Sequence, residues 1–146
     1  MAEFKALVDS PAEIIAMDAT KRKRPAGVSL PDMLAYVKRS GKLAIADIST
    51  LEEGVNAQKF GFDLISTTLS GYIGEKTQSD APDFKLIEQL KDAVHIPVIA
   101  EGWIQTPQEL IKVFYCGAYC AVIGSIITRP QVITKYFVFA LDGMGK

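Results

Sequence analysis

Five short runs of apolar residues recur along the chain, separated by longer stretches in which apolar and polar residues mix. Each run is about five residues long, is rich in Ile, Val and Ala, and does not alternate with polar residues. This pattern is typical of a strand that is buried on both faces of a parallel sheet. The predicted strands are Glu13–Asp18, Leu43–Asp47, Asp63–Thr67, Pro97–Glu101 and Tyr119–Gly124.

The stretches between these strands carry the signals of helix ends. Thr50 is followed three residues later by Glu53, which predicts a capping box, and Gly61 marks the end of the same helix. Thr106 precedes Pro107, a residue that is favoured at the first helical position. Helices are predicted over residues 29–41, 50–61, 83–93, 106–117 and 129–141. Strands and helices that alternate at this spacing favour an α/β domain with parallel strands and right-handed crossovers.

Three of the apolar runs end on an acidic residue: Asp18, Asp47 and Glu101. The carboxyl ends of parallel strands open on one rim of the sheet, where α/β proteins build their sites, so we expect these three carboxylates to converge. A carboxylate in that position is costly to desolvate unless something uses it. In the alternative interpretation, each acid caps the next helix or pairs with a basic neighbour.

Composition narrows the class of protein. The chain has 146 residues, 49% of them apolar and 23% charged, which is enough for one domain with a real core. The net charge of −1 gives no general attraction to nucleic acid or to an anionic membrane. No apolar run approaches the ~20 residues of a membrane span. No leader opens the chain and two cysteines make no disulfide framework, so we expect a cytoplasmic protein.

A run of four basic residues, at positions 21–24, has three possible interpretations. Such a tract can direct nuclear import or bind nucleic acid, and the net charge of the chain argues against a nucleic-acid role. It can also contact a substrate at the rim of the sheet, or form a solvated loop. The sequence favours a substrate contact or a solvated loop.

With the strands placed, four segments resemble the N-acetylmannosamine-6-phosphate 2-epimerase family. They are "IIAMDATKRKRP", "ADISTLEEGVNAQKFGFDLISTTLSGY", "IPVIAEG" and "GSIITRPQVITKYF". The resemblance implies a TIM barrel and maps this chain onto its fourth to eighth strands. We therefore expect residues 1–146 to form a single, incomplete TIM (β/α)8-type barrel of about five βα units, without the first three units of the family. Trp103 departs from the family, where glycine or arginine is expected.

The resemblance also implies a reaction, the interconversion of N-acetylmannosamine 6-phosphate and N-acetylglucosamine 6-phosphate in the catabolism of sialic acid and other amino sugars. It inverts C2 by deprotonation and reprotonation, and it needs no metal and no cofactor. Glu101 matches the acid/base glutamate of the family, and Asp47 matches an aspartate that holds the sugar or its acid/base partner. Asp18 is expected to stand behind them, and Thr67 and Thr68 to hydrogen-bond the sugar hydroxyls, unless they are ordinary strand threonines.

A phosphate site is expected at the loops after the last two strands, where TIM barrels often bind phosphate. Gly102 follows one of these strands, and Gly124 and Ser125 follow the other. Small residues let backbone N–H groups approach an oxyanion, and Arg129 can close on the phosphate. In the alternative, Gly124 only relieves crowding in a tight turn.

Two classes of function remain open. The first is an epimerase, and the second is a truncated, non-catalytic remnant that binds a phosphosugar or only associates with itself. The missing units of the family include a lysine at the end of the third strand, so we expect the 146-residue chain alone not to epimerise. The "STTLSGY" segment argues against a third interpretation, another phosphosugar isomerase of similar architecture. The outer strands Glu13–Asp18 and Tyr119–Gly124 would be free sheet edges, which predicts a homo-oligomer or edge-to-edge association.

Overall fold

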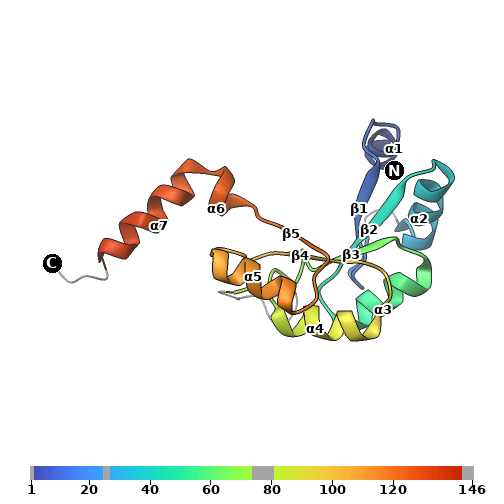
Figure 1. Cartoon of the computed structure of the whole chain (residues 1–146). Helices are drawn as coiled ribbons and strands as arrows, with labels where there is room; N and C mark the ends of the chain where they lie inside the picture. The colour runs from blue at the N-terminus through green and yellow to red at the C-terminus, as the bar shows by residue number, and fades with distance from the viewer. Residues whose placement is uncertain (1, 25–26, 74–80, 143–146) are drawn as a thin grey trace.

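A computed structural model describes residues 2–24, 27–73 and 81–142, which form one parallel sheet with helices packed on one side (Figure 1). The strand order is the chain order, and neighbouring strands are parallel. The strands are β1 (Ile14–Asp18), β2 (Leu43–Asp47), β3 (Leu64–Ser66), β4 (Val98–Glu101) and β5 (Cys120–Val122). The five predicted strands and their parallel arrangement are therefore confirmed, and the sheet is not closed into a barrel.

Helices alternate with these strands as the sequence predicts. They are α1 (Ala2–Val8), α2 (Leu30–Arg39), α3 (Leu51–Phe60), α4 (Phe84–Ala93), α5 (Pro107–Tyr115), α6 (Ser125–Thr128) and α7 (Pro130–Asp142). The capping box of Thr50 with Glu53 is present at the start of α3, and Gly61 ends that helix with a left-handed φ of 94°. A second capping box joins Thr106 to Glu109 at the start of α5.

Two helices were not predicted. In α1, Phe4 and Val8 lie one turn apart; Val8 is buried and Phe4 packs against the core and the ring of Tyr36. This spacing is a helix signal that the sequence does contain. The four-residue α6 begins after Gly124 without a side-chain cap, so nothing local announces it.

The core lies between the sheet and α2, α3, α4 and α5. Ile15 and Met17 of β1 point into it, as do Ala44 and Ala46 of β2 and Ile65 of β3. A second cluster between β4 and α5 contains Ile87, Ala100, Ile104, Val113, Cys116 and Ala118. These apolar contacts hold the carboxyl ends of the strands in register, and they fix the positions of the side chains that follow each strand.

The opposite face of the sheet is open toward its edges. Ile14 of β1 is 42% exposed, Leu43 of β2 is 46% exposed and Val122 of β5 is 43% exposed. The prediction that every strand is buried on both faces is therefore wrong for β1, β2 and β5, whereas Val98, Ile99 and Ala100 of β4 are all buried. The physical reason is that an unclosed sheet has no opposite wall to cover its second face.

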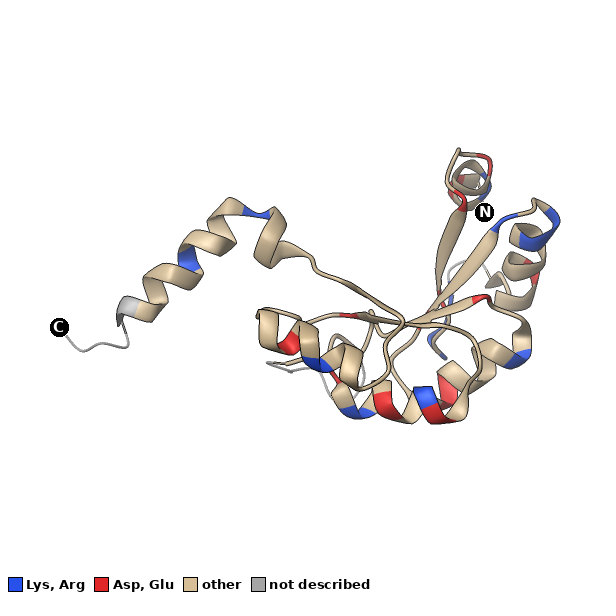
Figure 2. Ribbon diagram, viewed as in Figure 1, with Lys and Arg blue, Asp and Glu red and all other residues tan. Residues whose placement is uncertain are grey.

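Helix α7 extends away from the sheet (Figure 1). It is apolar on more than one face, and Phe137 and Phe139 are 67% and 66% exposed. Charged residues of both signs are interspersed along α2 to α5, whereas few lie on α7 (Figure 2). In the described part of the chain, no helix is both long enough and apolar enough to cross a bilayer.

Candidate functional site

The three predicted carboxylates lie at the ends of β1, β2 and β4. The register pairs Asp18 with Asp47 across β1 and β2, and Asp47 with Ser66 across β2 and β3. Glu101 ends β4, and its Oε2 lies 3.1 Å from Ser66 Oγ, next to Asp47 in the register. Parallel pairing thus collects polar groups that are far apart in the sequence on one rim, as the sequence predicts.

The Thr68 hydroxyl connects two of these acids. Its Oγ1 lies 3.0 Å from Asp47 Oδ1 and 2.9 Å from Glu101 Oε2. Ser66 Oγ lies 2.6 Å from the same Thr68 oxygen and 3.1 Å from Glu101 Oε2. Four side chains from three neighbouring strands and the loop after β3 therefore form one hydrogen-bonded cluster, which we call the rim cluster.

Within the rim cluster, Asp47 has an altered acidity. Burial raises the pKa of Asp47, and the negative charges of Glu101 and Asp18 raise it further, while the hydrogen bond with Thr68 lowers it; the result is a pKa of about 6. A carboxyl group with this pKa exchanges its proton near neutral pH, which is what acid/base chemistry requires. Asp47 is therefore equipped to hold or release a proton.

Asp18 has a different environment. Burial alone would raise its pKa, but hydrogen bonds from Thr20 and Arg22, with the charge of Arg22, leave the pKa of Asp18 lowered. Its Oδ1 accepts bonds from the backbone N–H and the hydroxyl of Thr20, and its Oδ2 accepts one from Arg22 at 2.5 Å. Asp18 thus remains ionised and organises the loop that follows it.

Three residues of the basic run at 21–24 also bind the protein itself. Arg24 donates to the carbonyl oxygens of Asp18 and Thr20, at 2.6 and 3.0 Å. Lys21 forms an exposed ion pair with Glu52. Together with Arg22 on Asp18, these contacts fold the run against the carboxyl ends of β1 and β2.

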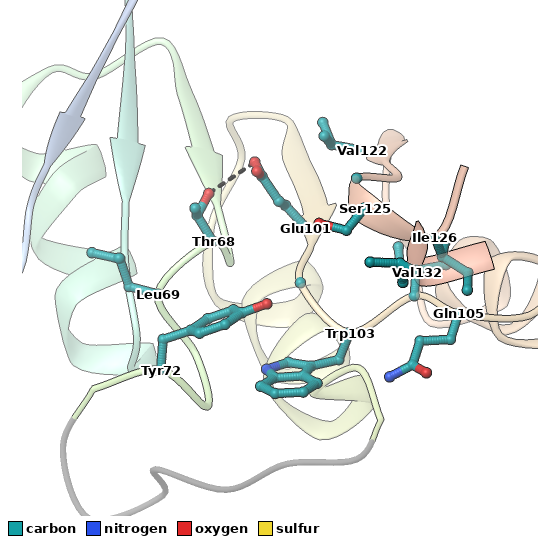
Figure 3. A pocket seen from close by; sticks show the side chains of 13 residues that line it. Thr68, Leu69, Tyr72, Glu101, Trp103, Gln105, Val122, Ser125, Ile126 and Val132 are labelled. Atoms are coloured by element: carbon teal, nitrogen blue, oxygen red, sulfur yellow. Dashed lines mark hydrogen bonds between the residues drawn. The ribbon is translucent and has the colours of Figure 1, made fainter. Parts of the chain in front are cut away.

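A cavity of about 530 Å³ opens beside the rim cluster (Figure 3). Five of the predicted site residues line it: Thr68, Glu101, Gly102, Gly124 and Ser125. In Figure 3, Glu101 lies between Thr68 and Ser125, and its carboxylate points toward Thr68. The structure therefore brings the expected acid/base group and the expected phosphate loops to one space.

Four predicted site residues do not line this cavity. Thr67 is buried, and its hydroxyl is engaged by the backbone of Glu101, accepting from the N–H at 3.0 Å and donating to the carbonyl at 2.9 Å. Asp47 lies behind Thr68, and Arg129 is exposed between α6 and α7. Asp18 lines a separate cavity of about 490 Å³ with Arg22 and Arg24.

Gly102 occupies a position that only glycine adopts easily. Its φ of 103° is left-handed, and a Cβ there would lie 3.4 Å from the ring of Tyr72. The backbone of the loop after β4 therefore comes close to the cavity with no side chain in between. Sequence motifs assigned Gly102 to the phosphate site, and the left-handed φ is the physical reason why a glycine is favoured at this position.

Sequence reasoning missed an aromatic pair at this cavity. The rings of Tyr72 and Trp103 are stacked, with centroids 4.9 Å apart and planes inclined by 20°. Trp103 has a left-handed φ of 61°, the only positive φ of a non-glycine residue in the described chain. Its buried indole nitrogen has no hydrogen-bond partner among the described residues. Ser66 was also missed, although it begins the same "STTLSGY" segment.

Metal ligation finds no support in the described residues, where no group of three or more His, Cys, Asp and Glu side chains could hold an ion. Cys116 and Cys120 are free thiols. The polar groups that the rim cluster and the cavity offer include carboxyl groups, hydroxyl groups and the backbone at Gly102 and Gly124.

Comparison with known proteins points to one family. A family model described as putative N-acetylmannosamine-6-phosphate epimerase matches residues 1–143. A putative N-acetylmannosamine-6-phosphate 2-epimerase of Clostridium perfringens is 55% identical over 137 residues, covering 94% of this chain and 62% of that protein. One of Clostridioides difficile is 47% identical over 140 residues, covering 96% and 63%. The chain thus spans somewhat less than two thirds of these curated relatives.

Solved structures agree with this comparison. The N-acetylmannosamine-6-phosphate 2-epimerase of Clostridium perfringens superposes with a TM-score of 0.90 at 53% identity, covering 94% of this chain and 60% of that structure. FabK of Thermotoga maritima superposes with a TM-score of 0.65 at 20% identity, covering 84% of this chain and 36% of that structure, which is a likeness of fold alone.

Proposed function

This chain belongs to the N-acetylmannosamine-6-phosphate epimerase family, and we propose that it carries the carboxylate half of an epimerase site. The proposed reaction interconverts N-acetylmannosamine 6-phosphate and N-acetylglucosamine 6-phosphate, as part of amino-sugar catabolism. The observation that carries the proposal is the position of Glu101, which faces the cavity together with Gly102, Gly124 and Ser125.

The proposed chemistry is acid/base catalysis at C2 of the open-chain sugar. This carbon lies next to the C1 aldehyde and carries the acetamido group, so a positioned base can remove its proton and leave an enolate whose negative charge is shared with the C1 oxygen. The negative charge that develops must be stabilised by donors, and a proton must then return to the opposite face of C2. We assign the acid/base role at one face of C2 to Glu101. Asp47 lies behind it and is proposed to assist Glu101 in taking up and releasing the proton.

The phosphate of the sugar is proposed to bind in the same cavity as Glu101, at the loops after β4 and β5. Gly102 and Gly124 expose backbone there, and Ser125 adds a hydroxyl group at the start of α6. A Cβ on Gly124 would meet nothing within 4 Å, so crowding does not require a glycine at that position. That observation favours the phosphate role over relief of a tight turn. Arg129 lies four residues beyond Ser125 and is proposed to close on the bound anion.

On its own, the 146-residue chain is proposed to bind the sugar phosphate without epimerising it. Inversion needs a second acid/base group on the other face of C2, and none of the five described strands contains a lysine. On the rim, Lys21 is engaged by Glu52. The chain spans 62% of its curated relative in Clostridium perfringens, so the second group is expected in the remaining part of such a protein. Proton NMR in heavy water is the direct check, and we expect no deuterium exchange at C2.

Phosphate-dependent binding is the first expected result. We expect isothermal titration to detect N-acetylglucosamine 6-phosphate and to detect no binding of unphosphorylated N-acetylglucosamine at the same concentration. Gly102→Val should abolish the binding, because the left-handed φ and the nearby Tyr72 ring both oppose a branched side chain. Gly27→Val is the matched control, because Gly27 also has a positive φ but lies away from the cavity. Equal binding of both sugars would remove Gly102, Gly124 and Ser125 from the proposal.

Self-association is the second expected result. The chain exposes apolar surface at three places, and contact of such surface with water is unfavourable. They are the open face of the sheet at Ile14, Leu43 and Val122, the two edge strands, and the rings of Phe137 and Phe139. We therefore expect light scattering at micromolar concentration to report a mass above the 15.9 kDa of one chain. Phe137→Lys with Phe139→Lys should lower that mass, whereas Lys135→Arg should not. A monodisperse monomer would contradict this expectation.

A further inference from the structure

We propose that the Thr68 hydroxyl is a proton relay that couples Asp47 to Glu101, so that the two carboxyl groups share one proton. This proposal deepens the proposed function and rests on it for its role in turnover. The hydrogen bonds on which the relay depends are formed by the protein itself, so the relay can be tested without substrate.

The rim cluster has fewer protons than hydrogen-bond contacts when both acids are ionised. The rim cluster contains four short oxygen–oxygen contacts: Thr68 with Asp47, with Glu101 and with Ser66, and Ser66 with Glu101. Each hydroxyl supplies one proton and each carboxylate supplies none. With both acids ionised, only two protons serve four contacts, and Thr68 faces one carboxylate oxygen with a lone pair. In the fully ionised state, two of the four contacts are therefore left without a proton.

One added proton reduces this shortage to a single contact. If Asp47 is protonated, it donates to Thr68, and Thr68 donates to Glu101, while Ser66 donates to Thr68. The Thr68 oxygen then accepts twice and donates once, which is its full capacity. The contact left without a proton is the one between Ser66 and Glu101, which at 3.1 Å is the longest of the four. The distances thus agree with a singly protonated pair.

Burial and the surrounding charges cause the cluster to lose this proton near neutral pH. The charged groups that face Asp47 are Glu101 from β4 and Asp18 from β1, the latter partly neutralised by Arg22. Ser66 and Thr68 approach from β3 and the loop after it, and β5 contributes only the apolar Val122 opposite Glu101. Two acids in one half-buried cluster do not both ionise readily, and burial of Asp47 holds its pKa near 6.

The relay moves a proton without a net change in charge. The Asp47 Oδ1–H bond breaks as its proton forms a new bond to Thr68 Oγ1. The original Thr68 O–H bond breaks as that proton bonds to Glu101 Oε2. Asp47 is left ionised, Glu101 is protonated, and Thr68 again carries one proton. Glu101, which faces the cavity, is thereby ready to protonate a carbanion equivalent, with Asp47 as its reserve.

The test is a carboxyl-carbon NMR titration of Asp47 and Glu101 in the unliganded 146-residue chain. Groups coupled in this way titrate in two macroscopic steps, because the shared hydrogen bonds favour the state with one proton. Thr68→Val keeps the shape and removes the hydroxyl, so we expect the separation of the two apparent pKa values to shrink by about one unit. Thr68→Ser keeps the hydroxyl and should preserve the separation.

Other outcomes are also decisive. An unchanged separation in Thr68→Val overturns the relay, and so does an equal collapse in Thr68→Ser, which would assign the effect to packing. Amide spectra of each variant establish that it is folded; if the valine variant is not, Thr68→Ala replaces it with the same expectation. Deuterium exchange at C2 in an assembled epimerase tests the proposed function separately, so either proposal can fail without the other.

Discussion

Replacing Glu101 by glutamine is expected to lower the epimerisation rate by at least about a hundredfold, the usual contribution of a positioned acid/base group. Glutamine keeps the size of the side chain and can still bond with Ser66 and Thr68, but it can neither accept nor return the C2 proton. Because this chain spans 62% of its Clostridium perfringens relative, the rate is to be measured in a fusion that supplies the remaining part from that relative. Loss of C2 deuterium exchange, followed by proton NMR, is the readout.

The matched control for this experiment is Glu52→Gln. Glu52 is an exposed glutamate at the start of α3 and its partner is Lys21, so its neutralisation removes only a surface ion pair. Exposed pairs contribute about 0–1 kcal/mol to stability, and the control rate should stay within about twofold of the unaltered fusion. A near-normal rate in Glu101→Gln would remove Glu101 from the mechanism.

Asp47→Asn is expected to stabilise the chain at pH 8 by about 2 kcal/mol. The pKa of Asp47 is about 6 in the folded protein, against 3.8 for an aspartate that the fold does not perturb. Between these two values the folded state binds more protons than the unfolded state, so stability falls as pH rises from about 4 to about 6 and stays lower above it. The shift corresponds to about 3 kcal/mol, which solvent screening of a half-buried group reduces to about 2 kcal/mol.

Urea unfolding of the two chains at several pH values is the measurement for Asp47→Asn. The two stabilities should be similar near pH 4, where Asp47 is protonated in the folded state, and should diverge as pH rises to 6. Asp92→Asn is the control, because Asp92 is exposed on α4 and its removal should change the stability by less than about 0.5 kcal/mol at any pH. A variant less stable than the parent at pH 8 would show that the charge of Asp47 is well solvated.

The raised pKa of Asp47 thus predicts that the site keeps a carboxyl group that costs stability at neutral pH. Removal of a buried charge commonly stabilises a protein when the charge serves chemistry instead of folding. Asp18, on the same rim, differs from Asp47. Its hydrogen bonds with Thr20 and Arg22 lower its pKa, so its ionised form stabilises the folded state. Two acids at adjacent strand ends therefore have opposite environments, and such a difference commonly separates a working acid from a supporting one.

Local signals in the sequence were sufficient for the elements and for the rim. Five apolar runs became five strands, and the capping boxes at Thr50 and Thr106 formed as predicted. These features depend on residues within a few positions of each other, so periodicity and hydrogen-bonding side chains decide them directly. Because parallel strands end on one rim, the same pattern was enough to bring Asp47 and Glu101 to the same side of the sheet.

Only the tertiary structure decided how these groups meet. The contact of Thr68 with both Asp47 and Glu101 joins residues 21 and 33 positions apart, and it depends on the register of three strands. The left-handed φ of Trp103 beside Tyr72, the open face at Ile14, and the projection of α7 likewise have no local signal. Sequence pattern determines which face a side chain takes, whereas distances of a few ångströms arise from packing, and acidity depends on those distances.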